Sequence, residues 1–113
     1  MAVVMLMEWP GVTKDDYDRV MDALGLDAKP PDGAFFHVAG QEGGSWRVLD
    51  IWESEDAWNR FFETRLRAAL QEAGLTDKGQ PDVRIYKVHN VYAPGTDALQ
   101  RLGAGSSLAG VAV

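Results

Sequence analysis

The alternation of apolar and polar residues predicts four strands. The strands are expected at residues 3–9, 34–40, 45–54 and 82–92. The first is a nearly continuous apolar run closed by Pro10 and Gly11, as in a strand buried on both faces. The second and third are separated by EGGS, whose adjacent glycines suit a two-residue hairpin turn. The last strand alternates strictly and is closed by Pro94.

Two amphipathic helices are predicted between these strands. Thr13 caps the first, with Asp16 three residues later in a capping box, and Gly25 ends it. Ser54 caps the second, which is expected over residues 55–73 with one wide apolar stripe. The aromatic residues of that stripe are interpreted as core and not as a cofactor site.

The predicted order is strand, helix, strand, strand, helix, strand. It indicates an α+β, ferredoxin-like fold, with a four-stranded antiparallel sheet that carries both helices on one face. Residues 1–94 are expected to form this single domain. Residues 95–113 are rich in Gly, Ala and Ser and are expected to form a flexible C-terminal tail.

The glycine turn predicts the register of the central hairpin. If Gly43 and Gly44 are the two loop residues, the cross-strand pairs are Phe35 with Trp52, His37 with Asp50, Ala39 with Val48, and Gln41 with Trp46.

Both faces of this hairpin are apolar. The cleaner set is expected to pack under the helices: Phe36, Val38, Leu49 and Ile51. The other set is then free of helices: Phe35, His37, Trp46, Val48, Asp50 and Trp52. Monomers rarely expose so large an apolar patch, so a partner sheet in a homodimer is expected to cover it.

Composition narrows the range of partners. The chain has 113 residues, a formal net charge of −6 and no cysteine. The negative charge argues against nucleic acid or an anionic membrane as partner. The lack of cysteine excludes disulfides, thiolate metal sites and cysteine nucleophiles. The apolar run at residues 2–7 is too short for a membrane span and lacks signal-peptide features, so a cytoplasmic location is expected.

Three motifs carry a resemblance to a known family. They are MEWPGVT after the first strand, VLDIWES before the second helix, and VHNVYAP at the end of the last strand. With the element order, they make residues 2–94 resemble the dimeric α+β barrel superfamily, and within it the small antibiotic-biosynthesis-monooxygenase-like proteins of actinobacterial type. The resemblance implies a homodimer whose two sheets pack face to face, with a pocket between helices and sheet or inside the barrel.

The resemblance implies several activities, because this scaffold hosts cofactor-free oxygenases, haem degraders, isomerases, cyclases and decarboxylases. The haem-degrading members use a helical histidine and an asparagine on the first strand, which this chain lacks. The quinone-forming members oxidise phenolic polyketides with dioxygen and without metal or flavin. The chain has suitable residue types for that chemistry.

His37 and Asp50 are the candidate catalytic pair. A carboxylate beside an imidazole orients it and raises its basicity, as a general base requires. Phe35, Trp46 and Trp52 would form apolar walls for a planar aromatic substrate. The alternative is that the pair is only a polar contact lining a solvent-filled dimer seam.

Further candidates lie on the outer strands. His89 is favoured as a pocket residue over Asn90, because Tyr86 and Val88 suit packing under the helices. Glu8 ends the first strand and is expected near the pocket rim, as a substrate contact or a solvated acid. Two histidines and two carboxylates could bind a metal, but no close ligand spacing supports it, so no metal and no cofactor are expected.

The sequence is compatible with two functions. One is an acid–base or oxygenase enzyme of the monooxygenase or cyclase type, acting on a small aromatic or polyketide-like compound. The other is a non-catalytic ligand-binding or assembly protein on the same scaffold.

Overall fold

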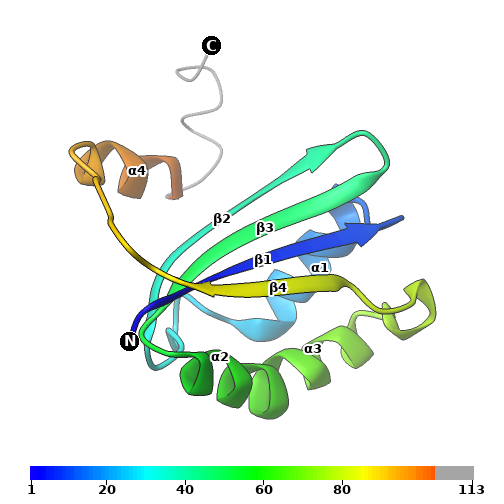
Figure 1. Cartoon of the computed structure of the whole chain (residues 1–113). Helices are drawn as coiled ribbons and strands as arrows, with labels where there is room; N and C mark the ends of the chain where they lie inside the picture. Colours follow the sequence, from blue (N-terminus) through cyan, green and yellow to red (C-terminus); the bar gives the residue numbers. More distant parts are fainter. Residues whose placement is uncertain (104–113) are drawn as a thin grey trace.

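The computed structural model describes residues 1–103, and these adopt the predicted order of elements (Figure 1). The elements are β1 (Val3–Pro10), α1 (Lys14–Leu24), β2 (Ala34–Glu42), β3 (Ser45–Trp52), α2 (Glu55–Phe61), η1 (Phe62–Leu66), α3 (Arg67–Glu72), η2 (Thr76–Lys78), β4 (Asp82–Lys87) and α4 (Thr96–Gly103).

The four strands form one antiparallel sheet in the order β2-β3-β1-β4. Helices α1, α2 and α3 all lie on one side of this sheet (Figure 1). The ferredoxin-like α+β fold predicted from the element order is therefore confirmed. None of the helices within residues 1–103 is both long and apolar enough to cross a membrane.

Capping residues fix where the helices begin, as the sequence predicts. Thr13 accepts a hydrogen bond from the Asp16 backbone N–H at 3.1 Å, and the Asp16 carboxylate accepts one from the Thr13 N–H at 3.0 Å. Ser54 caps α2 through the Ala57 N–H at 3.1 Å. The helical stretch after Ser54 is not uniformly α-helical, because η1 is a π-helical turn. Apolar periodicity does not reveal such a turn, since it shifts the hydrogen bonding by only one residue.

The central hairpin largely follows the predicted register. His37 pairs with Asp50, Ala39 with Val48, and Gln41 with Trp46. The predicted pairing of Phe35 with Trp52 is wrong. Ala34 pairs with Trp52, and Phe35 is the extra residue of a β-bulge, with 62% of its surface exposed. A bulge leaves one residue without a partner on the opposite strand, and the turn chemistry gives no sign of it.

The predicted assignment of the two sheet faces is wrong. Trp52 is 2% exposed in the core beside the helical residues Leu24 and Trp58, so the face that carries Asp50 and Trp52 lies under the helices. Val38, assigned to the helix side, is 50% exposed on the other face. Alternation separates the two apolar sets of side chains but does not show which set faces the helices. The large indole rings fill the deep space between sheet and helices.

The last strand is shorter than predicted. β4 ends at Lys87 instead of continuing to residue 92, because its partner β1 begins at Val3, which pairs with Lys87. Tyr86 was expected under the helices but is 52% exposed, whereas Ile85 packs against the core. The faces of this strand are thus reversed relative to the expectation.

The segment expected to be a flexible tail starts with helix α4. Residues 104–113 lie outside the described part of the chain, so the flexibility of the tail stays a prediction.

The start of α1 generates a stability prediction. The Asp16 carboxylate is buried and also pairs with Arg19 at 2.6 Å and with Lys78 at 3.2 Å. The backbone N–H of Thr13, with help from these two cations, lowers the pKa of Asp16 from 3.8 to about 2. This contribution to stability is complete above pH about 4 and is lost as the pH falls toward 2. Asp16→Asn should lower the free energy of unfolding by about 1 to 2 kcal/mol at pH 7.

Urea unfolding at pH 7 and at the lowest pH where the wild type folds measures this effect. The difference between wild type and Asp16→Asn should shrink in acid. Asp15→Asn, at an exposed position of the same helical turn, is the control and should have little effect at either pH. A pH-independent loss in Asp16→Asn would contradict the assignment.

Candidate functional site

A cavity of about 140 Å³ lies between the sheet and the helices. Its walls are almost entirely apolar and include Met5, Val48 and Trp52 from the sheet and Val20, Leu24 and Phe61 from the helices. It is the kind of concave, apolar space that binds small molecules when a few polar groups converge on it.

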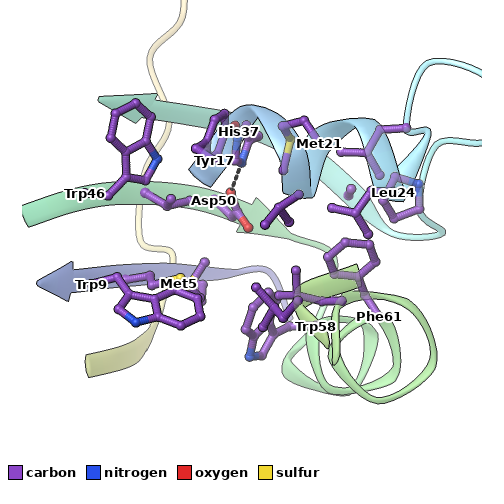
Figure 2. A pocket seen from close by; sticks show the side chains of 18 of the residues that line it. Met5, Trp9, Tyr17, Met21, Leu24, His37, Trp46, Asp50, Trp58 and Phe61 are labelled. Atoms are coloured by element: carbon purple, nitrogen blue, oxygen red, sulfur yellow. Dashed lines mark hydrogen bonds and ion pairs between the residues drawn. The ribbon is translucent and has the colours of Figure 1, made fainter. Parts of the chain in front are cut away.

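The polar groups of this cavity form one hydrogen-bonded chain, of which Figure 2 marks the contact between His37 and Asp50. The Nδ1 atom of His37 lies 2.6 Å from Asp50 Oδ1, and its Nε2 atom lies 2.5 Å from the Tyr17 hydroxyl. The Trp52 indole N–H donates to the other carboxylate oxygen of Asp50 at 3.0 Å. Four side chains from α1, β2 and β3 are thus linked.

Local structure places each member of the chain. The two-residue turn sets Asp50 directly across from His37, with both side chains on the helix side. Tyr17 lies one helical turn after the Thr13 cap, and its N–H donates to the Thr13 carbonyl. The capping box and the hairpin together bring the tyrosine and the histidine into contact.

Asp50 is a buried carboxylate, with 7% of its side chain exposed. Burying such a group is costly unless hydrogen bonds stabilise it, and His37 and Trp52 each provide a donor to one of its oxygens. In neutral His37 the proton therefore resides on Nδ1, and the Nε2 lone pair faces Tyr17. The carboxylate fixes both the tautomer and the orientation of the ring.

Tyr17 remains a phenol in this environment. Burial, with smaller effects from the negative charges of Asp50 and Asp18, raises the pKa of Tyr17 to about 12. Its hydroxyl therefore donates to His37 Nε2. The two rings are nearly parallel, with an interplanar angle of 4°.

Trp46 completes this end of the cavity. Its ring centroid lies 4.9 Å from that of Tyr17, at an angle of 35°. The Trp46 Nε1 atom is buried and has no hydrogen-bond partner among the described residues. Figure 2 shows Trp46, Tyr17 and His37 grouped at one end, and Trp58 and Phe61 at the other.

The structure brings together four of the residues predicted from the sequence: His37, Asp50, Trp46 and Trp52 all line the cavity. Because the pair lies under the helices, it does not line a seam between two sheets, which was the alternative interpretation of it.

The other three predicted site residues lie elsewhere. Phe35 projects from the bulge, and His89 is exposed beyond the end of β4. Glu8 lies on the helix-free face, where it contacts Arg47 and Ser45 at 3.3 Å. Reversal of the sheet faces and the early end of β4 account for these placements.

Sequence reasoning missed Tyr17. It occupies an apolar-stripe position of α1, and that pattern predicts only that its side chain faces the core. The signal that could have identified it is its hydroxyl, since a buried tyrosine usually directs its O–H to a partner. Within residues 1–103, no three His, Asp or Glu side chains come close enough together to hold a metal ion.

Comparisons with known proteins were made by sequence and by structure. No family model matches the chain, and no curated protein matches it.

Several solved structures are similar in fold. SnoaB, a cofactor-independent oxygenase from Streptomyces nogalater, superimposes with a TM-score of 0.58 at 12% identity, over 80% of this chain and 94% of SnoaB. The ActVA-Orf6 monooxygenase of Streptomyces coelicolor, solved with nanaomycin D, gives 0.56 at 18% identity, over 83% and 93% of the two chains. Rv0793 from Mycobacterium tuberculosis gives 0.63 at 11% identity, over 80% and 98%.

At such low identity the likeness concerns the fold. It agrees with the resemblance of the sequence motifs, and the chain has the ferredoxin-like α+β fold of the antibiotic-biosynthesis-monooxygenase-like proteins.

Proposed function

We propose that the chain is a cofactor-independent enzyme that removes a proton from a small phenolic or polyketide-like compound and lets the resulting anion react with dioxygen. The observation that carries the proposal is the hydrogen-bonded chain of Tyr17, His37 and Asp50 at the end of an apolar cavity. An oriented base beside an aromatic-lined cavity is what such a reaction requires.

The dimensions of the cavity favour an aromatic ring. An apolar cavity of about 150 Å³ in another protein admits benzene, and the volume here is about 140 Å³. One ring of the ligand would fill the space, with its hydroxyl near His37. The unpartnered Trp46 N–H is a donor that a second ligand oxygen would satisfy if the indole shifted slightly.

The His37–Asp50 pair would store the proton. When the imidazole becomes an imidazolium, the carboxylate 2.6 Å away stabilises the new charge. The apolar walls keep water away from the anion of the ligand, so that its electrons remain available to dioxygen.

The oxidation balances without an external reductant. Deprotonation of the phenolic O–H gives an anion whose charge is delocalised onto a ring carbon that carries one hydrogen. This anion transfers an electron to dioxygen, a C–O bond then forms, and the stored proton returns to give a hydroperoxide. Loss of water leaves a second carbonyl, so the phenol and O₂ give a quinone and H₂O. The ligand is oxidised by four electrons, and dioxygen is reduced by the same four.

The structural neighbours support this proposal, since SnoaB is described as a cofactor-independent oxygenase and ActVA-Orf6 as a monooxygenase. Catalysis is favoured over simple binding because a purely apolar binder would gain nothing from a buried carboxylate held against a histidine.

Removing the base tests the function. His37→Gln keeps a similar shape but cannot accept a proton, so dioxygen uptake with phenolic substrates should fall by about 10²-fold or more. Oxygen-electrode measurements with purified protein and a panel of hydroxylated one- to three-ring aromatics give the rates.

His89→Gln is the matched variant, because His89 lies outside the cavity. It should retain the wild-type rate. Full activity in His37→Gln would contradict the proposed base, and no uptake by the wild type with any phenol would favour the non-catalytic alternative.

We also propose that the chain forms a homodimer through the helix-free face of the sheet. Val38 and Tyr86 are 50% and 52% exposed there, beside a groove of about 540 Å³ that also carries Arg47 and Arg84. An apolar sheet face of this kind is stable in water when a second sheet covers it.

Sedimentation equilibrium tests the dimer. The wild type should sediment as a dimer at micromolar concentration, whereas Val38→Arg should shift it toward monomer, because the new charge would be buried without a partner. Gln71→Arg, on the exposed side of α3, is the control and should remain dimeric. A monomeric wild type would overturn the assembly.

A further inference from the structure

Both ring nitrogens of His37 are already occupied. Nδ1 faces Asp50 at 2.6 Å, and Nε2 faces the Tyr17 hydroxyl at 2.5 Å. A neutral imidazole has one N–H and one acceptor lone pair, and here each has a partner. No acceptor of His37 is therefore free to meet a proton of the ligand directly.

Tyr17 offers the acceptor that His37 lacks. A phenolic hydroxyl has one proton and two lone pairs, and Tyr17 uses its proton on His37. Tyr17 lines the cavity and is half-buried. The structure gives its oxygen no hydrogen bond from another described residue, so a lone pair is left for a ligand.

We infer, on the basis of the function proposed above, that Tyr17 is a catalytic residue that accepts the proton of a phenolic ligand while passing its own proton to His37 Nε2. Two O–H bonds break, and one O–H bond and one N–H bond form. The ligand O–H breaks as a new O–H forms on Tyr17, and the former Tyr17 proton becomes the N–H of an imidazolium. Charge is conserved, because a phenolate and an imidazolium replace two neutral groups.

The product of this transfer is well stabilised. The new Tyr17 O–H points at the ligand phenolate and donates a hydrogen bond to it. The imidazolium lies between Tyr17 and the Asp50 carboxylate. The raised pKa of Tyr17, about 12, means that Tyr17 is a neutral phenol both before and after the transfer and does not persist as a tyrosinate.

Direct access of the ligand to His37 would require Tyr17 to leave its place. That movement would break the hydrogen bond to His37 and the contact with Trp46, whose ring centroid lies 4.9 Å away. Each of these interactions stabilises the resting arrangement. Proton transfer through Tyr17, here called the relay, needs no such rearrangement. Removing the Tyr17 hydroxyl should lower the rate if the relay operates and raise it if the ligand must displace Tyr17.

The test uses 4-nitrophenol, whose phenolate absorbs visible light and whose neutral form does not. The probe is titrated into wild-type protein, Tyr17→Phe, His37→Gln and the control Tyr92→Phe, at a pH where the free probe is mostly neutral. Quenching of tryptophan fluorescence measures binding, and visible absorbance measures the ionised fraction of the bound probe. Tyr92 is 85% exposed outside the cavity, so its substitution removes a hydroxyl without touching the site.

Tyr17→Phe keeps the ring that packs on Trp46, so the affinity for the probe should change by less than about threefold. The ionised fraction should fall at least tenfold, as it should in His37→Gln, while Tyr92→Phe behaves as wild type. With an oxidisable phenol, Tyr17→Phe should lower kcat by about 10²-fold and leave KM nearly unchanged. Thermal unfolding of Tyr17→Phe confirms that the fold is intact.

Other outcomes separate this assignment from the proposed function. If Tyr17→Phe ionises the probe as well as the wild type and His37→Gln does not, Tyr17 is not the relay, but His37 is still the base of the proposed function. A Tyr17→Phe variant with a higher rate would mean that the ligand displaces Tyr17, and would also overturn the relay. If the wild type binds no phenol or ionises none, the proposed function fails, and the relay fails with it.

Discussion

The structure depends on one buried carboxylate. Asp50 lies in the middle of the layer between sheet and helices, where an uncompensated negative charge would be strongly destabilising. The hydrogen bonds from His37 and Trp52 make this position tolerable. The bond from His37 requires β2 and β3 to pair in a single register, whereas Trp52 lies on the same strand as Asp50. A slip by one residue would place either His37 or Asp50 on the opposite face and leave the other alone. The polar pair therefore specifies the hairpin as well as supplying the candidate chemistry.

The same interaction couples the sheet to the first helix. His37 uses one nitrogen on Asp50 and the other on Tyr17, so the orientation of the imidazole is set from both sides of the cavity. Tyr17 in turn is held by Trp46 and by the start of α1, where the Asp16 carboxylate binds Arg19 and Lys78. Locally stabilised secondary structure thus positions a site whose residues are distant from one another in sequence. A rigid arrangement of this kind is suited to proton transfer, which depends on short and well-aligned contacts.

The two faces of the sheet serve different purposes. The helix-covered face carries the indole rings and the cavity, because large aromatic side chains fill the depth between a sheet and a helix layer. The opposite face carries apolar residues such as Val38 and Leu49 beside the groove, and this is the surface proposed to pack on a second sheet. The ion pair of Glu8 and Arg47 lies at the groove on this outer face and not in the cavity. The molecule separates the surface proposed for assembly from the site proposed for chemistry.

The sequence by itself determined the order of elements, the helix caps at Thr13 and Ser54, the glycine turn, and the pairing of His37 with Asp50. All of these follow from local rules: side-chain capping, positive φ at Gly43, and strict alternation along strands. Only the tertiary structure decided which apolar face lies under the helices, because alternation is symmetrical and gives no direction. It also decided where β4 stops, since that depends on where β1 begins, and it placed the bulge at Phe35. The role of Tyr17 was hidden for the same reason: a helix pattern shows that a side chain faces inward, but its partner, 20 residues away in the chain, is chosen by packing alone.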